Sequence, residues 1–396
     1  YISFRIKKTA DGVTDKSRMV DGIPWIDRMT VKTGGLMVED IQEYGTLERM
    51  LGLFGKETDA RASLVGDLSG VAENHGDTEF DYMCDDLSTR AEATKGCPFT
   101  KPLLSGVIGA GQEYMLPIGL FESAGSHALQ LELYLAKDNQ VLSKITGSGA
   151  AFSPTYELMD VRLNVEVVQL PERAMAAFNQ GVSNGMISLP FKSYNTYRQY
   201  IPSSQSALDM NIVESSHNVQ KVLVGMRTQD SLGAYTTKWK KGDSDDNYAF
   251  VGGKSTSTAI KQFNFRYGQE QFPPAPVECE GSSLPAVLNT LSSMDMLGSS
   301  VKLTAFNKRH TSADVHTRVP RYEDKAFVIA QGLKSSVDDI DNGLNASAIG
   351  APLQLFLKFD NTAGANLALF AFTESTYSLN VKAGGNVTIV DGDVVA

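Results

Sequence analysis

Residues 161–181 read VRLNVEVVQLPERAMAAFNQG, and the period of their hydropathy pattern changes partway along. Apolar and polar residues alternate from Val161 onward, which predicts a β-strand with one apolar face that ends near residue 170. The pattern then becomes helical: Pro171 suits a first helical turn, Glu172 suits the positive end of a helix dipole, and Gly181 suits a helix end. The stretch therefore predicts a closing strand followed by a short helical connector.

Strand patterns continue on both sides of this stretch. Strands are expected at 2–6, 22–35, 103–108, 113–121, 127–135 and 156–170 before the connector, and at 186–191, 210–213, 219–226, 260–267, 353–359, 367–372, 377–381 and 387–390 after it. Apolar stripes predict helices at 39–51 and 284–296. The prolines within 272–276 are expected to end the strand before them.

Repeated strands with few helices favour antiparallel sandwiches or barrels, and the absence of alternating β-α units argues against a doubly wound sheet. The chain is therefore predicted to be all-β. We expect a first β domain over residues 1–170, a helical connector over 171–185 and a second β domain over 186–396.

The composition is that of an ordinary folded chain, with 42% hydrophobic and 21% charged residues among 396. The net charge of −10 argues against a protein that coats nucleic acid with its whole surface. The densest basic cluster, residues 238–241, is followed by Asp243 and is interpreted as a solvated loop. Cys84, Cys97 and Cys279 form no CxxC pair, so neither a disulfide framework nor a zinc site is predicted, and synthesis in a reducing compartment is favoured.

Two glycine-rich segments approach nucleotide-binding motifs without completing them. Residues 252–256, GGKST, would need a glycine at the place of Tyr248 to form a phosphate loop. Residues 106–111, GVIGAG, would need a further glycine at the place of Tyr114 and a helix afterwards. Both segments are interpreted as turns.

Acidic and histidine residues also lack the spacing of known sites. In residues 338–343, DDIDNG, Gly343 stands where a calcium loop needs a ligand. HExxH does not occur, no Ser-hydrolase elbow is predicted, and the five histidines are scattered: His75, His127, His217, His310 and His316. No catalytic, cofactor-binding or metal-ligating residue is therefore predicted, no cofactor is expected, and the chain is not expected to be an enzyme. A glycosidase carboxylate pair needs no sequence motif and stays open.

Several longer segments, taken in chain order, resemble one protein family. They are GGLMVEDIQEYGTL at 34–47, YMLPIGLF at 114–121 with ALQLEL at 128–133, FNFRYGQEQFPPAP at 263–276, and the strand-rich tail at 353–390. They resemble the double jelly-roll major capsid proteins of icosahedral double-stranded DNA viruses. The likeness is greatest to the proteins of virophages and Polinton-like viruses, which are distantly similar to adenovirus hexon.

The resemblance implies two consecutive eight-stranded antiparallel jelly rolls with a few short helices in the connections. It implies a structural major capsid protein that trimerises into pseudo-hexagonal capsomers, which form an icosahedral shell around a double-stranded DNA genome. The implied location is the virion, after synthesis in the host cell cytoplasm. The polar segments 55–98, 228–258 and 298–325 are the expected outer loops and subunit contacts.

The resemblance also implies the partners. They are other copies of the chain in a homotrimer, neighbouring capsomers, and penton and minor capsid proteins. Sequence-specific nucleic-acid binding is not implied, and contact with packaged DNA or an inner membrane would be indirect.

Two other hypotheses stay open. One is a two-domain β-sandwich that binds a receptor or glycan, as a spike does, and the other is a β-sandwich carbohydrate enzyme. A glycan site needs exposed aromatic rings, and Trp25 and Trp239 are the two tryptophans; Trp25 is expected in the core.

Overall fold

The structure is a computed structural model of the 396-residue chain. It describes residues 1–8, 17–19, 24–54, 97–109, 114–121, 128–145, 153–229, 232, 237–238, 249–254, 256–296, 309–311, 318–320, 326–333, 343–347, 352–382 and 387–391. The expected loops 55–98, 228–258 and 298–325 lie mostly outside these ranges.

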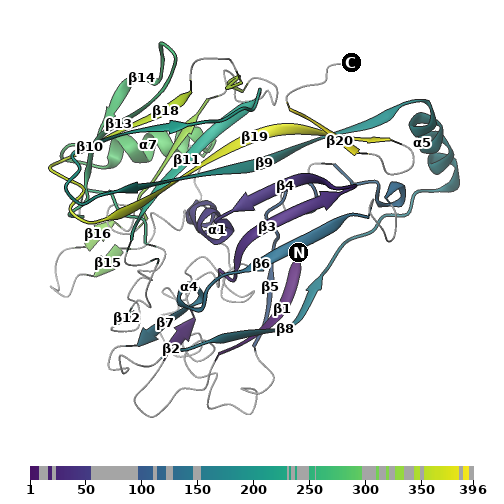
Figure 1. Cartoon of the computed structure of the whole chain (residues 1–396), viewed down its shortest axis with the longest axis horizontal. Helices are drawn as coiled ribbons and strands as arrows, with labels where there is room; N and C mark the ends of the chain where they lie inside the picture. The colour runs from purple at the N-terminus through teal and green to yellow at the C-terminus, as the bar shows by residue number, and fades with distance from the viewer. Residues whose placement is uncertain are drawn as a thin grey trace.

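The first half of the chain forms a lobe of two three-stranded antiparallel sheets (Figure 1). One has the order β5-β1-β8, with β1 Ile2–Lys8, β5 Cys97–Lys101 and β8 Tyr156–Leu163. The other has the order β4-β3-β6, with β3 Ile26–Thr33, β4 Leu36–Gln42 and β6 Gln130–Leu135. A smaller sheet joins β2 Ser17–Met19, β7 Leu142–Ile145 and β12 Thr237–Lys238. The lobe also contains α1 Tyr44–Leu53, the 3-10 turn η2 Ile118–Leu120 and α4 Asp138–Val141.

The second half forms a larger lobe, reached through α5 Glu172–Asn184. One sheet has the order β10-β18-β13-β14, with β10 Ala207–Ile212, β13 Ile260–Tyr267, β14 Glu270–Glu278 and β18 Leu353–Phe359. The other has the order β17-β11-β19-β20, and β9 pairs with β19 as well. Its strands are β9 Met186–Ile201, β11 Val219–Thr228, β17 Val328–Gly332, β19 Leu367–Lys382 and β20 Val387–Asp391. Helix α7 Leu284–Ser293 packs on β17, and β15 Arg309–Thr311 pairs with β16 Arg318–Pro320.

The two lobes repeat one order of elements and one set of pairings. Along the chain, β1, β3, β4, α1, β5, β6 and β8 correspond to β11, β13, β14, α7, β17, β18 and β19. Strand β1 lies between β5 and β8 as β11 lies between β17 and β19. Strand β3 lies between β4 and β6 as β13 lies between β14 and β18. Because the chain in each lobe crosses repeatedly between two sheets, apart from the hairpins β3-β4 and β13-β14, each lobe has the connectivity of a jelly roll.

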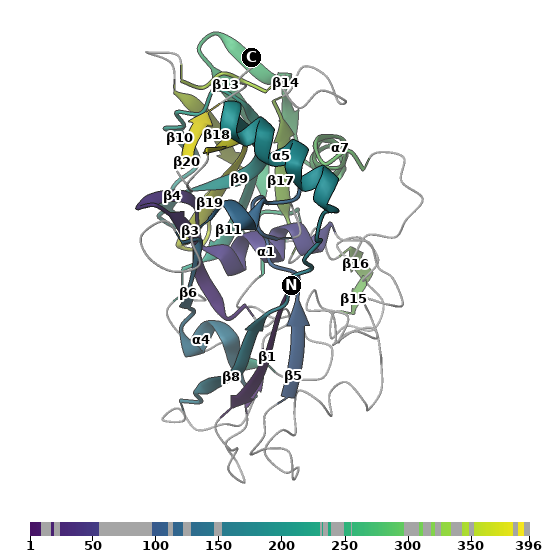
Figure 2. The ribbon, with the colours of Figure 1, turned by 90° about the vertical axis from the view of Figure 1, so that its right-hand side faces the viewer.

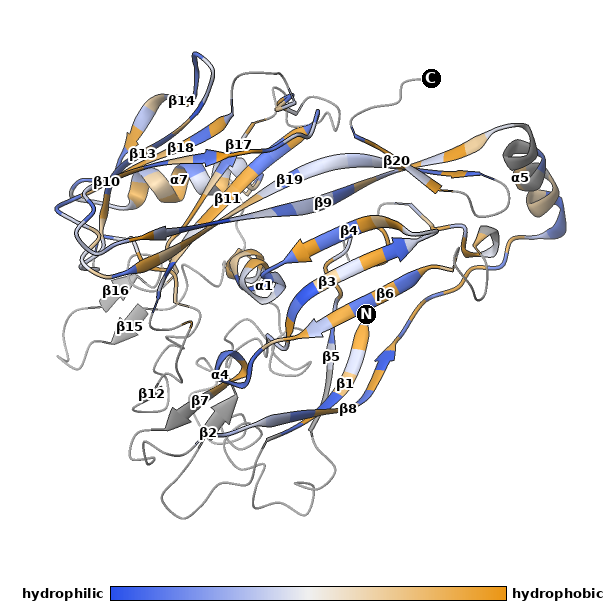
Figure 3. Cartoon of the chain, in the orientation of Figure 1, coloured by the Kyte–Doolittle hydropathy of each residue, from blue (hydrophilic) through white to orange (hydrophobic). Residues whose placement is uncertain are grey.

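The alternating hydropathy of the strands explains which face each one buries (Figure 3). In β18, Leu353, Leu355 and Leu357 are at most 1% exposed, while the residues between them reach the surface. Strand β19 is buried along almost its whole length because β9 and β11 flank it. Trp25 packs on Phe4 with ring centroids 5.1 Å apart, which confirms that it belongs to the core. The prediction of an all-β chain with a few short helices is also confirmed.

The helix expected at 39–51 begins later than predicted. Residues 39–42 belong to β4, which pairs with β3, and α1 begins at Tyr44. The spacing of three between Val38 and Ile41 suits a helix face, but β4 pairs with β3 with an irregularity in the register, and both residues are buried in the strand. Glu43, with a φ of 51°, turns the chain out of the strand.

Other strand predictions were wrong in extent. The described parts of 103–108 and 113–121 form turns and η2, because their backbone groups do not enter a sheet. The prolines of 272–276 do not end a strand but lie inside β14, which is tolerated because β14 is an edge strand. Strand β8 ends at Leu163, well before residue 170.

Candidate functional site

The described residues of the nucleotide-like motifs lie in turns and bends and make contacts within the fold. In GGKST, the Lys254 ammonium lies 3.4 Å from Asp360, and the Lys254 N–H donates to the Ser283 hydroxyl at 2.9 Å. The Gly106 N–H of GVIGAG donates to Glu39. Gly343, which follows the expected acidic turn, donates its N–H to the Asn218 side chain at 2.9 Å, while residues 338–342 lie outside the described ranges. Among the described residues of these motifs, the backbone and charged groups make contacts within the fold and form no phosphate cradle.

Metal-binding and nucleophilic groups do not gather in the described part of the chain. No cluster of three or more His, Cys, Asp or Glu residues that could hold a metal ion occurs there. His217 lies 3.3 Å from Asp391. Burial raises the pKa of the Cys279 thiol to about 12, so this cysteine is a poor nucleophile. His75, His127, His316, Cys84 and Trp239 lie outside the described residues. The described helices include none that is long and apolar enough to cross a membrane.

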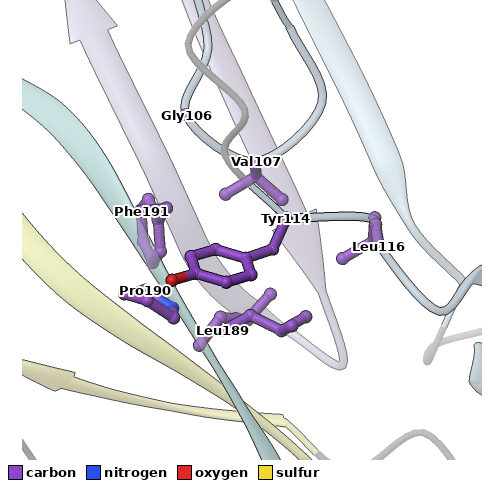
Figure 4. Close-up of a pocket in the computed structure, with 8 residues that line it drawn as sticks. Gly106, Val107, Tyr114, Leu116, Leu189, Pro190 and Phe191 are labelled. Atoms are coloured by element: carbon purple, nitrogen blue, oxygen red, sulfur yellow. The ribbon is translucent and has the colours of Figure 1, made fainter.

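Two hollows stand out on the described surface. Figure 4 shows a narrow crevice in which the Tyr114 ring lies between Val107 and Leu189, and the space it leaves would hold about one water. A larger hollow of about 340 Å³ lies on the outer face of the β10-β18-β13-β14 sheet. It is lined by Asp209, Asn264, Arg266, Gln271, Pro276, Gln354 and Phe356.

Side-chain hydrogen bonds join the two lobes where they meet. Helix α1 lies between the lobes in both views (Figures 1 and 2). Arg227 of β11, fully buried, donates from Nη1 to the Thr46 hydroxyl of α1 at 3.0 Å. Its guanidinium also lies 5.8 Å from the Phe370 ring centroid. The Thr196 hydroxyl of β9 donates to the Gln42 carbonyl at 2.9 Å. The junction is therefore hydrogen-bonded rather than only apolar.

A buried carboxylate forms a second part of this junction. Glu39 of β4 is 2% exposed and accepts hydrogen bonds from the Ser105 hydroxyl and from the Gly106 N–H, the latter at 2.9 Å. Burial raises the pKa of Glu39 to about 7, although hydrogen bonds from Ser105, Gly106, Val107 and Ser193 oppose the shift. Because Ser193 lies on β9, this carboxyl joins three segments from both lobes.

Close backbone approach explains why a glycine stands at position 106. A Cβ there would lie 2.0 Å from the Lys192 carbonyl oxygen of β9, which is a backbone atom that cannot move aside. The segment 103–109 therefore fits against the second lobe only with glycine at this position. The sequence did not predict that Glu39 and Gly106 join the two lobes. For Glu39, the one indication in the sequence was a carboxylate next to the apolar residues of β4.

A run of exposed apolar residues continues from β8 into the segment after it. Val161, Leu163, Val165, Val167, Val168 and Leu170 are 40–66% exposed. Met175 on α5 and Met186 at the start of β9 are also exposed, at 39% and 45%. An exposed run of apolar residues such as 161–170 is typical of a protein–protein contact.

The chain is similar in structure to viral capsid proteins of the double jelly-roll type. The crystal structure of PBCV-1 VP54, fitted into a cryo-EM reconstruction of the virophage Sputnik, matches with a TM-score of 0.58 and 12% identity over 99% of this chain and 89% of that chain. A quasi-atomic model of the PBCV-1 virus capsid matches with a TM-score of 0.56, 12% identity and the same coverage. No protein-family model and no curated protein matches the sequence.

These likenesses define the class of fold. The chain is a double jelly roll of the kind found in major capsid proteins, and the fold prediction is confirmed. At 12% identity the matches show the fold alone, so the role of the chain is a separate question.

Proposed function

We propose that the chain is a structural major capsid protein that trimerises into pseudo-hexagonal capsomers of an icosahedral shell around a double-stranded DNA genome. The observation that carries this proposal is the match of nearly the whole chain, both lobes together, to the fold of PBCV-1 VP54. A fold can host many functions, so the proposal also depends on the surfaces of this chain.

The junction supports a role in which the lobes act as one rigid block. A capsomer with six jelly rolls from three chains needs a fixed angle between the two rolls of each chain. Glu39, Gly106 and Arg227 hold the lobes through contacts that tolerate little change. We assign residues 1–170 to the first roll, 171–185 to a connector that includes α5, and 186–396 to the second roll.

The surfaces support partners of the same kind. The exposed apolar run of residues 161–170 is suited to burial against protein, and the net charge of −10 is unsuited to wrapping DNA. The proposed partners are further copies of the chain, neighbouring capsomers, and penton and minor capsid proteins in the virion. Packaged DNA or an inner membrane would be contacted indirectly, and we assign no enzymatic activity or cofactor to the chain.

Light scattering after size exclusion tests the proposal. We expect a stable species of three times the 42.9 kDa chain mass, seen as a six-lobed ring in negative-stain images. A monodisperse monomer at micromolar concentration would refute the trimer.

A second candidate function, glycan or receptor binding, is favoured by the larger hollow on the β10-β18-β13-β14 sheet alone. There Phe356, 36% exposed, lies among polar side chains that include Arg266 and Asp209. A monomer that binds a glycan array, and loses that binding in Arg266→Ala, would support this alternative in place of the capsid role.

A further inference from the structure

The larger hollow lies on the outer face of the β10-β18-β13-β14 sheet, where the register of the strands sets its side chains in two rows. In the first row, Phe356 of β18 lies between Asp209 of β10 and Asn264 of β13. In the second row, Gln354 of β18 lies opposite Arg266 of β13. Neighbouring strands are about 5 Å apart and the two rows about 7 Å apart, so these side chains face one shared space.

Asn264 is a buried polar residue without a partner. It is 6% exposed and lines the hollow, and its side-chain amide makes no hydrogen bond to any other residue that the structure describes. A side-chain amide offers an N–H donor group and an acceptor oxygen, and buried amides are normally hydrogen-bonded. The unused amide of Asn264 therefore points to a polar ligand in the hollow.

Arg266 is a cation that lacks a carboxylate. Its side chain is exposed, and in the described part of the chain it forms no ion pair, whereas Lys261 of the same strand lies 2.7 Å from Glu280. A guanidinium binds a carboxylate through two parallel hydrogen bonds, so a carboxylate on the ligand suits Arg266. A phosphate, with nearly two negative charges, suits the hollow less, because Asp209 also lines it.

Phe356 gives the polar hollow one apolar surface. Its side chain is 36% exposed, and Gln354 and Lys358, which precede and follow it on the same face of β18, are polar. A sugar ring has hydroxyl groups around its rim and C–H bonds on its faces, so it can lie over an aromatic ring while its rim bonds to amides. Sites for apolar ligands are lined mainly by apolar side chains, so this lining favours a sugar.

The position of the hollow argues against other kinds of ligand. Extended peptides often bind by adding a strand to a sheet edge, but β18 and β13 beneath the hollow are each paired on both sides. Nucleic acid is disfavoured because the chain has a net charge of −10, and the described lining of the hollow includes one arginine and no lysine.

We propose that the larger hollow binds a sugar unit that carries a carboxylate, such as the terminal unit of a sialylated or uronic-acid-containing glycan. Arg266 holds the carboxylate, the ring lies over Phe356, and hydroxyl groups bond to Asn264 and Asp209. This inference rests on the second candidate function, glycan binding, and names the class of ligand. It does not rest on the capsid proposal.

A glycan array, followed by calorimetry in solution, tests the proposal on the full chain. Each sialylated or uronic-acid-containing glycan on the array is paired with its neutral counterpart. We expect at least one acidic glycan to bind. Its neutral counterpart should bind about tenfold more weakly, because it lacks the charged hydrogen bonds to Arg266.

Three variants locate the ligand. Arg266→Met should weaken binding of the acidic glycan about tenfold and leave its neutral counterpart unchanged, because only the partner of the carboxylate is lost. Phe356→Ala should weaken binding of both glycans. Arg173→Met is the control, since Arg173 is exposed on α5, which lies at the opposite end of the molecule from the hollow in Figure 1. The three melting temperatures should match the wild type, because all three side chains reach the surface.

Each possible failure has a separate reading. Equal binding of acidic and neutral glycans would overturn this inference and leave the second candidate function standing. Binding of no glycan would overturn both, and an acidic peptide that bound instead, with the same dependence on Arg266, would assign the hollow to a protein partner. Binding that Arg266→Met leaves unchanged would place the ligand elsewhere and equally overturn the inference. Light scattering on the same samples tests the trimer independently.

Discussion

The buried carboxyl of Glu39 makes the stability of the lobe junction depend on pH. Burial raises its pKa to about 7 in the folded protein, whereas an exposed glutamate has a pKa near 4.5. The folded protein therefore keeps a proton on Glu39 at pH values where the unfolded chain has lost it. This difference corresponds to about 3 kcal/mol in the free energy of unfolding.

The sign follows from which state binds the proton. Below a pH of about 4.5 both states are protonated, so Glu39 imposes no penalty. As the pH rises toward 7, the free energy of unfolding falls, and above 7 the whole penalty is present. Glu39→Gln keeps the size of the side chain and its hydrogen-bonding capacity without the charge. We expect the variant to match the wild type near pH 4.5 and to exceed it by up to about 3 kcal/mol at pH 8.

Urea unfolding followed by tryptophan fluorescence measures this difference, since Trp25 is buried in the first lobe. Glu132→Gln is the control, because Glu132 lies at the surface beside Lys32, and its pKa is lowered by that hydrogen bond. An equal stability difference between wild type and Glu39→Gln at pH 5 and pH 8 would refute the reasoning.

Three further predictions concern the same region and the second lobe. Gly106→Ala places a methyl group against the Lys192 carbonyl and should lower the melting temperature by several degrees, with loosened lobes visible in small-angle scattering; unchanged melting and scattering would contradict the close approach. Arg227→Met removes the hydrogen bond to Thr46 and should cost about 1–3 kcal/mol in urea unfolding, whereas a Met substitution of an exposed arginine should cost little. Cys279, whose pKa is raised to about 12, should react with iodoacetamide at pH 8 only in denaturant, as read by peptide mass spectrometry; rapid labelling of the folded protein would disprove its burial.

The local hydropathy pattern of the sequence was sufficient to predict many of the strands and helices of the fold. Alternation located β13 and β18 to within a residue, and Pro171 and Glu172 predicted the start of α5, although the helix continues past Gly181. These elements are decided by neighbouring residues, because the period of apolar side chains matches one type of backbone. The order along the chain of the segments that resemble capsid proteins then indicated the double jelly roll. No single one of these segments is sufficient to indicate it.

The candidate site was not predictable in the same way. Glu39 was expected in the first turn of a helix, where a carboxylate would be solvated, but it lies buried in β4 beneath Ser105. Gly106 was placed both in a strand at 103–108 and in a turn motif at 106–111, and the structure has a turn there. The reason for glycine at this position is the Lys192 carbonyl, which lies far away in sequence. Such roles depend on contacts between lobes, and the sequence does not contain the angle at which the lobes meet.

The stretch 161–181 divides what the sequence determined from what the tertiary structure decided. By itself the sequence determined that an alternating segment passes into a helix, and that both neighbouring halves are built of strands. Only the tertiary structure decided that β8 stops at Leu163 while its counterpart β19 continues for sixteen residues. The physical reason is that alternation sets the faces of a strand, whereas the length of a strand depends on a neighbour that completes its backbone hydrogen bonds.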